Sequence, residues 1–322
     1  MTSGNMLADR RLEMARALHE RGDRAAAAEL LEQALELAPD WVGGHFLLAG
    51  WLEEAGRRDD AVALYRRCLG LDPRDRVGAV VRLALLGAVA ATPELPQAYV
   101  AGVFDDYAER FEAALVERLA YRVPAALHDL VAALVPPGTV HARVLDLGCG
   151  TGLAGERFRA SSSWLEGVDL SEGMVALARR KSLYDDLEVG EAVAFAGARR
   201  DRYDLVVAAD VLVYMGELSG VMGAVAGALV PGGRFAFSVE ATEGEGYRLT
   251  AGHRYAHSRA CLLAQAGAAG LVVESLVETT CRLEAGVPLR AYLAVVRRPA
   301  EGMSASEPAS AEGHVAIDRP FN

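Results

Sequence analysis

A loop of alternating glycines follows a short apolar run near the middle of the chain. The run VLDL at 144–147 leads into the loop GCGTG, which comprises Gly148, Cys149, Gly150, Thr151 and Gly152. Glycine adopts positive φ without strain and exposes the backbone, so such a loop after a strand is typical of sites for nucleotide-like ligands. The spacing differs from the dinucleotide fingerprint G-x-G-x-x-G, whose third glycine would fall at Leu153. The alternative is a strand-to-helix turn that binds no ligand.

Three carboxylates near strand ends match the other groups of one ligand. Asp146 lies just before the loop, where a carboxylate would repel a pyrophosphate and would suit an ammonium group. Asp169 ends the next strand and could accept hydrogen bonds from both hydroxyls of a ribose. Glu191 could accept a hydrogen bond from an adenine amino group, although it could also simply begin a helix. An ammonium end, a ribose and an adenine without phosphate indicate S-adenosylmethionine.

Further polar residues gather in the segment GHRYAHS at 252–258, after the fifth predicted strand. His257 is a candidate general base, because imidazole titrates near neutrality. Arg254 is a candidate to hold an acidic group on a substrate, with Tyr255 beside it. The alternative is that His257 and Ser258 only begin the helix that follows.

Other candidates stand at the ends of the fourth and fifth predicted strands. Asp210 ends the run at 203–210 and Tyr214 follows it, while Glu240 ends the run at 233–240. In open α/β sheets, ligands bind outside the carboxyl ends of the strands. We therefore predict Asp210 and Tyr214 as catalytic candidates and Glu240 as a substrate contact.

The elements that must position these residues alternate in type after residue 100. Strand-like runs occupy 143–148, 165–170, 203–210, 233–240, 271–279 and 290–298, with a short one at 186–190. Helical runs separate most of them, which predicts a parallel sheet with helices on both faces. The last two runs are joined by a short turn and should form an antiparallel hairpin at the sheet edge.

The first 90 residues repeat with a period of 34, which relates Gly22 to Gly56, Ala27 to Ala61 and Pro39 to Pro73. Each unit is predicted as a helix, a turn at glycine, a second helix and a proline stop. This pattern resembles the tetratricopeptide repeat over residues 8–73, with a capping helix at 76–88.

Residues 100–298 resemble the class I S-adenosylmethionine-dependent methyltransferases. The resemblance is carried by VLDLGCGTG, by GVDLS with a methionine three residues later, by YDLVVAADVLVY and by LVPGGRFAFSVE. It implies an α/β fold with a Rossmann-like, seven-stranded sheet and an antiparallel edge hairpin. The whole chain resembles predicted bacterial methyltransferases that carry N-terminal tetratricopeptide repeats.

The resemblance also implies roles for the residues above. Asp146 and the loop 148–152, Cys149 included, would hold the methionine end of the cofactor. Asp169 would hold the ribose, with Ser171 beginning the helix beside it, and Glu191 would meet the adenine amino group.

The remaining roles concern the walls of the site. Leu170 and Met174 would wall the adenine, and Asp210 would lie beside the methionine moiety and the substrate. Tyr107 and Phe111 lie four residues apart on the run VFDDYAERFEAAL, which resembles the helix that closes over the cofactor. The alternative for these two aromatic residues is a pair that faces the core.

Composition restricts the partners. The chain of 322 residues carries a net charge of −11, which disfavours a nucleic-acid partner. Its four cysteines lack CxxC spacing, so neither a zinc site nor a disulfide framework is predicted, and free thiols fit the cytoplasm. The N-terminus has no apolar core of signal-peptide length, and the longest apolar run, 79–91, contains Arg82 and is too short to cross a membrane.

These observations predict a tetratricopeptide region at 1–90, a linker at 91–99, a methyltransferase domain at 100–299 and a disordered tail at 300–322. The segment ADVLVY replaces the Asn/Asp-Pro-Pro-Tyr signature of nucleic-acid amine methylation, and a small molecule is the main expectation for the acceptor. A protein acceptor recruited by the repeats is the alternative. A scaffold that binds the cofactor without turnover is an alternative of another class.

Overall fold

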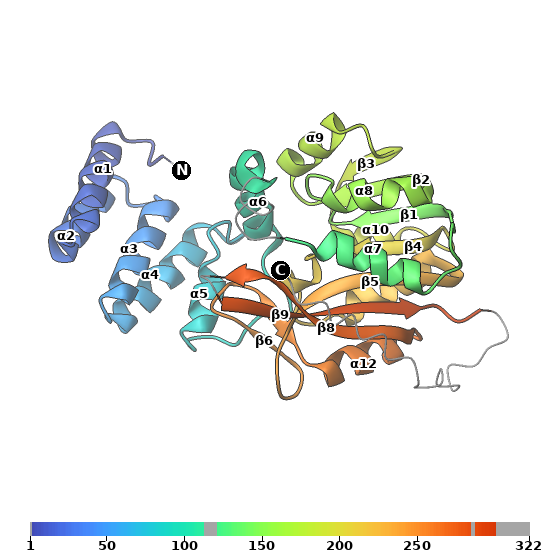
Figure 1. The fold of residues 1–322 in the computed structure, drawn as a ribbon. Helices are drawn as coiled ribbons and strands as arrows, with labels where there is room; N and C mark the ends of the chain where they lie inside the picture. The colour runs from blue at the N-terminus through green and yellow to red at the C-terminus, as the bar shows by residue number, and fades with distance from the viewer. Residues whose placement is uncertain (1, 113–120, 285–286, 301–322) are drawn as a thin grey trace.

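An all-helical region leads into an α/β region along the chain (Figure 1). The computed structural model describes residues 2–112, 121–284 and 287–300, and the side chains at 106–107, 109–112, 281–284 and 287 lie outside this description. The predicted disordered tail also lies outside the described residues from 301 onward. No described helix is long and apolar enough to cross a membrane.

The repeat region consists of helices that pair in sequence. They are α1 (Met6–Glu20), α2 (Arg24–Leu37), α3 (Val42–Glu54), α4 (Arg58–Leu71) and α5 (Ala79–Leu85). The residues related by the 34-residue period are buried in both units: Ala27 with Ala61, and Leu31 with Tyr65. Small residues let the paired helices approach, and the larger pair fills the space between them. The predicted helix–turn–helix repeat is therefore confirmed.

The capping helix is shorter than the predicted run at 76–88. Asp75 has φ +50° and Gly78 has φ +76°, so the chain turns before α5 begins. The carboxylate of Asp75 then accepts hydrogen bonds from the amides of Ala79 and Val80 at 2.6 and 2.9 Å. These bonds satisfy two amides in the first turn of α5, which begins at Ala79.

The α/β region is built on one twisted sheet. Its strands are β1 (His141–Leu147), β2 (Ser162–Asp169), β3 (Asp186–Val189), β4 (Tyr203–Ala208), β5 (Leu229–Ala241), β6 (Tyr247–Leu249), β7 (Tyr255–His257), β8 (Val272–Glu284) and β9 (Val287–Arg297). The order is β3-β2-β1-β4-β5-β7-β6, and β9 pairs antiparallel with both β5 and β8. Strands β1 to β5 are parallel to one another. The predicted parallel sheet and its antiparallel hairpin are confirmed.

The described sheet has nine strands, where the sequence predicts seven. The two additional strands, β6 and β7, are three residues each; β7 pairs with the carboxyl end of β5, and β6 pairs with β7. Such short segments carry no recognisable period, so sequence patterning places β7 in a loop. The segment GHRYAHS is therefore partly a strand, and this placement decides the orientation of its side chains.

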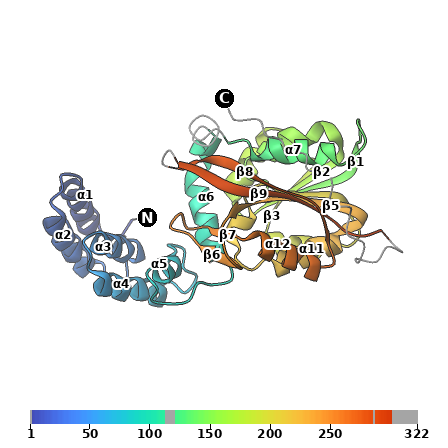
Figure 2. The same cartoon turned by 60° about the horizontal axis from the view of Figure 1, so that its bottom comes forward.

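Helices cover both faces of the sheet (Figure 2). One face carries α7 (Val123–Ala133) and α8 (Leu153–Phe158), and the other carries α10 (Ala192–Gly197), α11 (Ser219–Ala228) and α12 (Arg259–Ala268). Two more helices, α6 (Gln97–Glu112) and α9 (Glu172–Arg180), contact each other.

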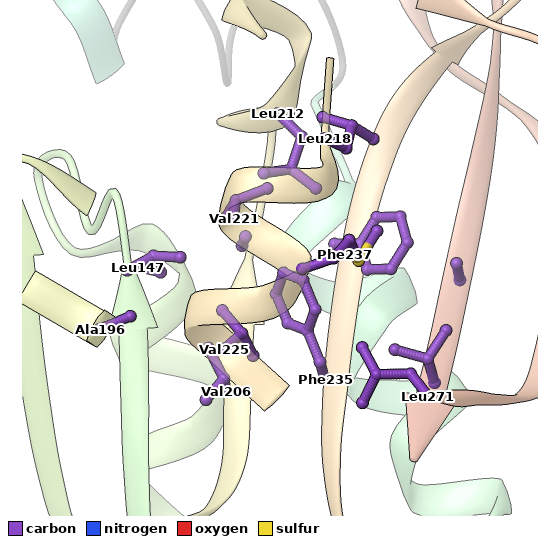
Figure 3. Close-up of a cluster of buried hydrophobic side chains, with 14 of the residues drawn as sticks. Leu147, Ala196, Val206, Leu212, Leu218, Val221, Val225, Phe235, Phe237 and Leu271 are labelled. Atoms are coloured by element: carbon purple, nitrogen blue, oxygen red, sulfur yellow. The ribbon is translucent and has the colours of Figure 1, made fainter. Parts of the chain in front are cut away.

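Apolar residues on β5 alternate between the two cores. Figure 3 shows Phe235 and Phe237 in one cluster with Val221 and Val225 of α11, whereas Ala236 belongs to the cluster under α7. Burial on both faces explains why the strands are continuously apolar in sequence.

The segment predicted as a linker, 91–99, runs along the sheet domain. The carbonyl of Pro93 accepts hydrogen bonds from the amides of Gly216 and Glu217 at 2.7 and 2.9 Å. The amide of Leu95 donates to the carbonyl of Tyr214 at 2.9 Å, and its side chain is buried. These bonds tie the segment between the repeats and α6 to the chain that follows β4.

Candidate active site

The glycine loop joins β1 to α8 at the carboxyl edge of the sheet. Gly148, Gly150 and Gly152 have φ of +73°, +52° and +94°. A Cβ on Gly148 would lie 2.3 Å from Cγ2 of Val211, whereas a Cβ on Gly150 would meet no atom within 4 Å. The first glycine therefore permits close packing, and the second leaves open space over its backbone for a ligand.

Asp169, at the end of β2, connects this loop to the start of α9 through hydrogen bonds. Its Oδ2 accepts a hydrogen bond from the amide of Gly150 and its Oδ1 accepts one from the amide of Ser171, both at 2.8 Å. The hydroxyl of Ser171 caps α9 and donates to Asp105 of α6 at 2.5 Å. Burial raises the pKa of Asp169, while the two backbone bonds oppose that rise.

Asp146 is buried beneath the loop. The hydroxyl of Tyr184 donates to its Oδ2 at 2.6 Å, and its buried Oδ1 receives no hydrogen bond of normal geometry from the described residues. Burial raises the pKa of Asp146 to about 7, and the charge of Asp169 adds to this effect. Tyr184 fits there because the neighbouring positions are glycines: a Cβ on Gly155 would lie 2.4 Å from the Tyr184 hydroxyl.

A cavity of about 360 Å³ opens above the loop. The predicted residues that line it are Gly148, Cys149, Gly150, Asp169, Leu170, Met174, Glu191, Asp210, Tyr214 and Arg254. The predicted residues that do not line it are Asp146, Gly152, Ser171, Glu240, Tyr255 and His257. The structure thus brings together candidates from β1, β2, β4 and the chain around β7. The side chains of Tyr107 and Phe111 lie outside the described residues.

Several lining residues have no signal in the sequence. They include Leu95, Gln97, Phe104, Tyr121, Val211 and Met215. Phe104 of α6 packs edge-on against Tyr214, with ring centroids 5.6 Å apart. Helix α6 therefore borders the cavity, as the resemblance implies. The aromatic side chain that it is seen to contribute is Phe104.

Glu191 lines the cavity and also caps α10. Its carboxylate accepts hydrogen bonds from the amides of Val193 and Ala194 at 2.7 and 2.6 Å. The helix-starting alternative for Glu191 is thus present in the structure. A contact with adenine stays a prediction, since a carboxylate has further lone pairs.

Polar groups cluster at one end of the cavity around Asp210. The hydroxyl of Ser238 donates to Oδ1 of Asp210 at 2.8 Å, and the side chain of Tyr121 also hydrogen bonds to this carboxyl. Burial raises the pKa of Asp210, and its residue adopts φ +58°. A non-glycine residue held in this strained region is frequent at functional sites.

Arg254 reaches the same cluster from the turn before β7. Its Nη1 lies 3.5 Å from Oε1 of Glu240, and its guanidinium also hydrogen bonds to the Tyr214 side chain. Glu240 does not line the cavity itself, but it pairs with Arg254, which does. One cation, one carboxyl and two phenols thus face the same end of the cavity.

Two families match separate parts of the chain. Residues 12–40 and 45–77 match the tetratricopeptide repeat, and residues 145–235 match the methyltransferase domain. This chain carries a methyltransferase domain. The matched part of that domain runs from β1 into β5 and contains the glycine loop, Asp169 and Asp210. Both resemblances drawn from the sequence are confirmed.

Curated relatives match part of the chain. The chain is 30% identical over 105 residues to a ubiquinone biosynthesis O-methyltransferase of Aromatoleum aromaticum, covering 31% of this chain and 45% of that protein. It is 47% identical over 62 residues to a malonyl-[acyl-carrier protein] O-methyltransferase of Erwinia pyrifoliae, covering 19% of this chain and 24% of that protein. The chain thus spans less than half the length of these relatives.

A solved structure shares the fold. The magnesium protoporphyrin IX methyltransferase of Synechocystis PCC 6803 with bound S-adenosylmethionine aligns with a TM-score of 0.50 and 19% identity. The alignment covers 65% of this chain and 99% of that chain. At this identity the likeness is one of fold.

The structure of the methyltransferase domain corrects the prediction of His257 as a general base. His257 is fully buried in β7, and its Nε2 lies 3.0 Å from the carbonyl of Gly216, to which a neutral ring donates. Burial lowers the pKa of His257 to about 4. Tyr255 is buried too, and its hydroxyl donates to the carbonyl of Thr92. Neither residue lines the cavity, so both support the domain's packing instead of meeting a substrate.

His257 should make the protein sensitive to acid. Its folded pKa of about 4 lies below the ordinary 6.5, so the unfolded chain binds a proton that the folded chain rejects. The contribution of His257 to the free energy of unfolding is fully present above pH 6.5. It falls by about 3 kcal/mol as the pH decreases toward 4. Urea unfolding at several pH values should show a shallower acid loss in His257→Gln, which keeps an N–H donor. Equal slopes in both proteins would contradict this expectation.

Proposed function

We propose that the protein transfers the methyl group of S-adenosylmethionine to a small-molecule acceptor. The observation that carries the proposal is the single cavity shared by the glycine loop, Asp169 and the Asp210 cluster within the matched domain. The relatives' names favour an oxygen atom as the acceptor.

The residues present fit this cofactor. The open space over Gly150 admits a ligand to the backbone, and the carboxyl of Asp146 beneath the loop favours an ammonium group there over a phosphate. Each oxygen of Asp169 accepts one backbone bond and keeps lone pairs for the ribose hydroxyls. Leu170 and Met174 supply apolar walls for the adenine. When bound, the cofactor supplies a methyl group on a positively charged sulfur.

The protein's part in the reaction is alignment and proton removal. Walls of the cavity hold the acceptor in line with the methyl group, which removes the entropy cost of a bimolecular encounter. Asp210 accepts the proton of an acceptor hydroxyl, because burial makes its carboxylate more basic. The hydroxyls of Tyr121 and Tyr214 and the Arg254 guanidinium orient the polar end of the acceptor.

Cofactor binding tests the first half of the proposal. Calorimetry should show binding of S-adenosylhomocysteine and none of NAD, because the loop spacing and Asp146 disfavour a pyrophosphate. Gly150→Val should abolish binding, since a side chain there would enter the cavity at φ +52°. Binding of NAD without S-adenosylhomocysteine would contradict the cofactor assignment.

A protein acceptor is the second candidate, because the chain contains tetratricopeptide repeats, which commonly bind peptides. Incubation of the protein with methyl-labelled cofactor and a cell extract, followed by separation by size, distinguishes the candidates. Label in small metabolites supports the proposal, and label in protein bands supports the alternative. Cofactor binding without label in either fraction would favour a scaffold that does not turn over.

A further inference from the structure

Arg82 of α5 crosses from the repeat region to the methyltransferase domain. Within the repeats, its Nη2 donates to Oε2 of Glu53 at 2.6 Å and its Nε donates to the hydroxyl of Tyr65 at 3.3 Å. Its Nη1 lies 3.2 Å from Nε2 of His253, in the turn between β6 and β7. One guanidinium therefore joins α3, α4 and α5 to that turn.

His253 is held from a second side by the chain that leads out of the repeats. The hydroxyl of Tyr99 on α6 lies 3.0 Å from its Nδ1. Because a guanidinium can only donate, Nε2 must be the acceptor, and Nδ1 of the neutral ring then donates to Tyr99. Burial, followed by the charge of Arg82, lowers the pKa of His253, in agreement with this neutral ring.

The turn that contains His253 also presents Arg254 to the cavity. His253 adopts φ +57°, and its amide donates to the carbonyl of Thr250 at 3.0 Å. The amide of Thr250 donates back to the carbonyl of Arg254 at 2.8 Å. A left-handed histidine is strained and persists where its surroundings hold it. The direction in which Arg254 leaves the turn thus depends on contacts made by His253.

Apolar packing joins the same elements. Val81 of α5, Leu95 and Tyr255 of β7 form one buried cluster, and Leu95 also lines the cavity. Figures 1 and 2 both place α5 beside β6, at the junction of the two regions. The last repeat helix, the segment after it and the turn before β7 therefore form one continuous wall.

We propose that Arg82 is a positioning residue for the acceptor side of the active site: through His253 it fixes the turn that presents Arg254 to the cavity. The repeat region is then a structural part of the acceptor site as well as a surface for partners. This inference rests on the proposed function for its kinetic consequence. The contacts of Arg82 and Tyr99 with His253, here called the clamp, can be tested without turnover.

The test uses the whole chain, with and without S-adenosylhomocysteine, and two variants that break these contacts. Arg82→Met removes all three donors, and His253→Asn removes the ring while asparagine tolerates the left-handed backbone. The matched control is Arg67→Met, which removes an exposed arginine that lies 3.5 Å from Asp40 in the repeats. Hydrogen exchange, followed by mass spectrometry, reports on the amides of 250–256.

We expect faster exchange in this turn by about tenfold or more in both clamp variants and no change in the control. Affinity for S-adenosylhomocysteine should stay within about twofold, since Arg82 does not line the cavity. With an acceptor identified by the labelling experiment, KM for the acceptor should rise about tenfold and kcat should change less. Arg82→Lys should recover part of this loss, because it keeps the charge beside Glu53.

Unchanged exchange in both clamp variants would overturn the inference, whether or not the protein methylates anything. Faster hydrogen exchange in this turn with an unaltered KM for the acceptor would also overturn it, since Arg254 would then not contribute to acceptor binding. Failure of the proposed function has a different signature: the clamp responds to Arg82→Met, but neither cofactor binding nor methyl transfer is measurable.

Discussion

Replacement of Asp210 with asparagine is expected to lower the rate of methyl transfer by roughly 10²–10⁴-fold, the usual contribution of one acid–base group. Asparagine has nearly the same shape and tolerates the left-handed backbone at φ +58°. It can still bond to the Ser238 hydroxyl, but it cannot take a proton. The affinity for S-adenosylhomocysteine should therefore change little while kcat falls. Steady-state kinetics with the identified acceptor, beside calorimetry, measures both quantities.

The pH profile gives a second readout of Asp210. Burial raises the pKa of its carboxyl above the ordinary 3.8, so the active carboxylate is lost as the pH falls through that raised value. The wild-type rate should decline on the acid side, and the asparagine variant should lack that limb. Ser238→Ala is the matched control, because it removes a hydrogen bond to Asp210 and keeps the carboxylate. Full activity in Asp210→Asn would mean that the acceptor loses its proton without Asp210.

Local patterns were sufficient to predict which residues meet around the glycine loop. A glycine loop and the carboxylate that ends the next strand are both set by the chain near them, because parallel strands bring their carboxyl ends to one edge. Gly150 and Asp169 are 19 positions apart, and the predicted neighbours prove to be directly hydrogen-bonded. The period of 34 is local in the same sense, since each repeat contacts its neighbours.

The contacts around β7 could not be predicted in this way, because they join distant parts of the chain. His257 was a reasonable base by residue type, yet its partner is the carbonyl of Gly216, which lies 41 positions away. Arg82 reaches His253 across 171 positions. No period or motif relates such pairs. The prolines of the segment at 91–97 predict a linker but give no sign that Pro93 bonds to the chain beyond β4.

Replacement of Asp169 with alanine is expected to weaken the binding of S-adenosylhomocysteine by at least about 100-fold. Each hydrogen bond from a ribose hydroxyl to a carboxylate contributes about 1.5–3 kcal/mol, and the variant loses both. It also releases the amide of Gly150, so the loop under the ligand loses its tie to β2. Calorimetry of the wild type and the variant measures the loss directly, and thermal unfolding measures any accompanying loss of stability.

The matched control is Asp204→Ala. The carboxylate of Asp204 also accepts two backbone hydrogen bonds, from Ala142 and Arg143 at 2.7 and 2.8 Å, but it stands at the start of β4 and does not line the cavity. Asp204→Ala should therefore lower the unfolding temperature and leave the dissociation constant nearly unchanged. Equal weakening in both variants would assign the effect to general loss of stability. An unchanged dissociation constant in Asp169→Ala would remove Asp169 as the ribose ligand, and the backbone amides of the glycine loop would then have to carry the affinity.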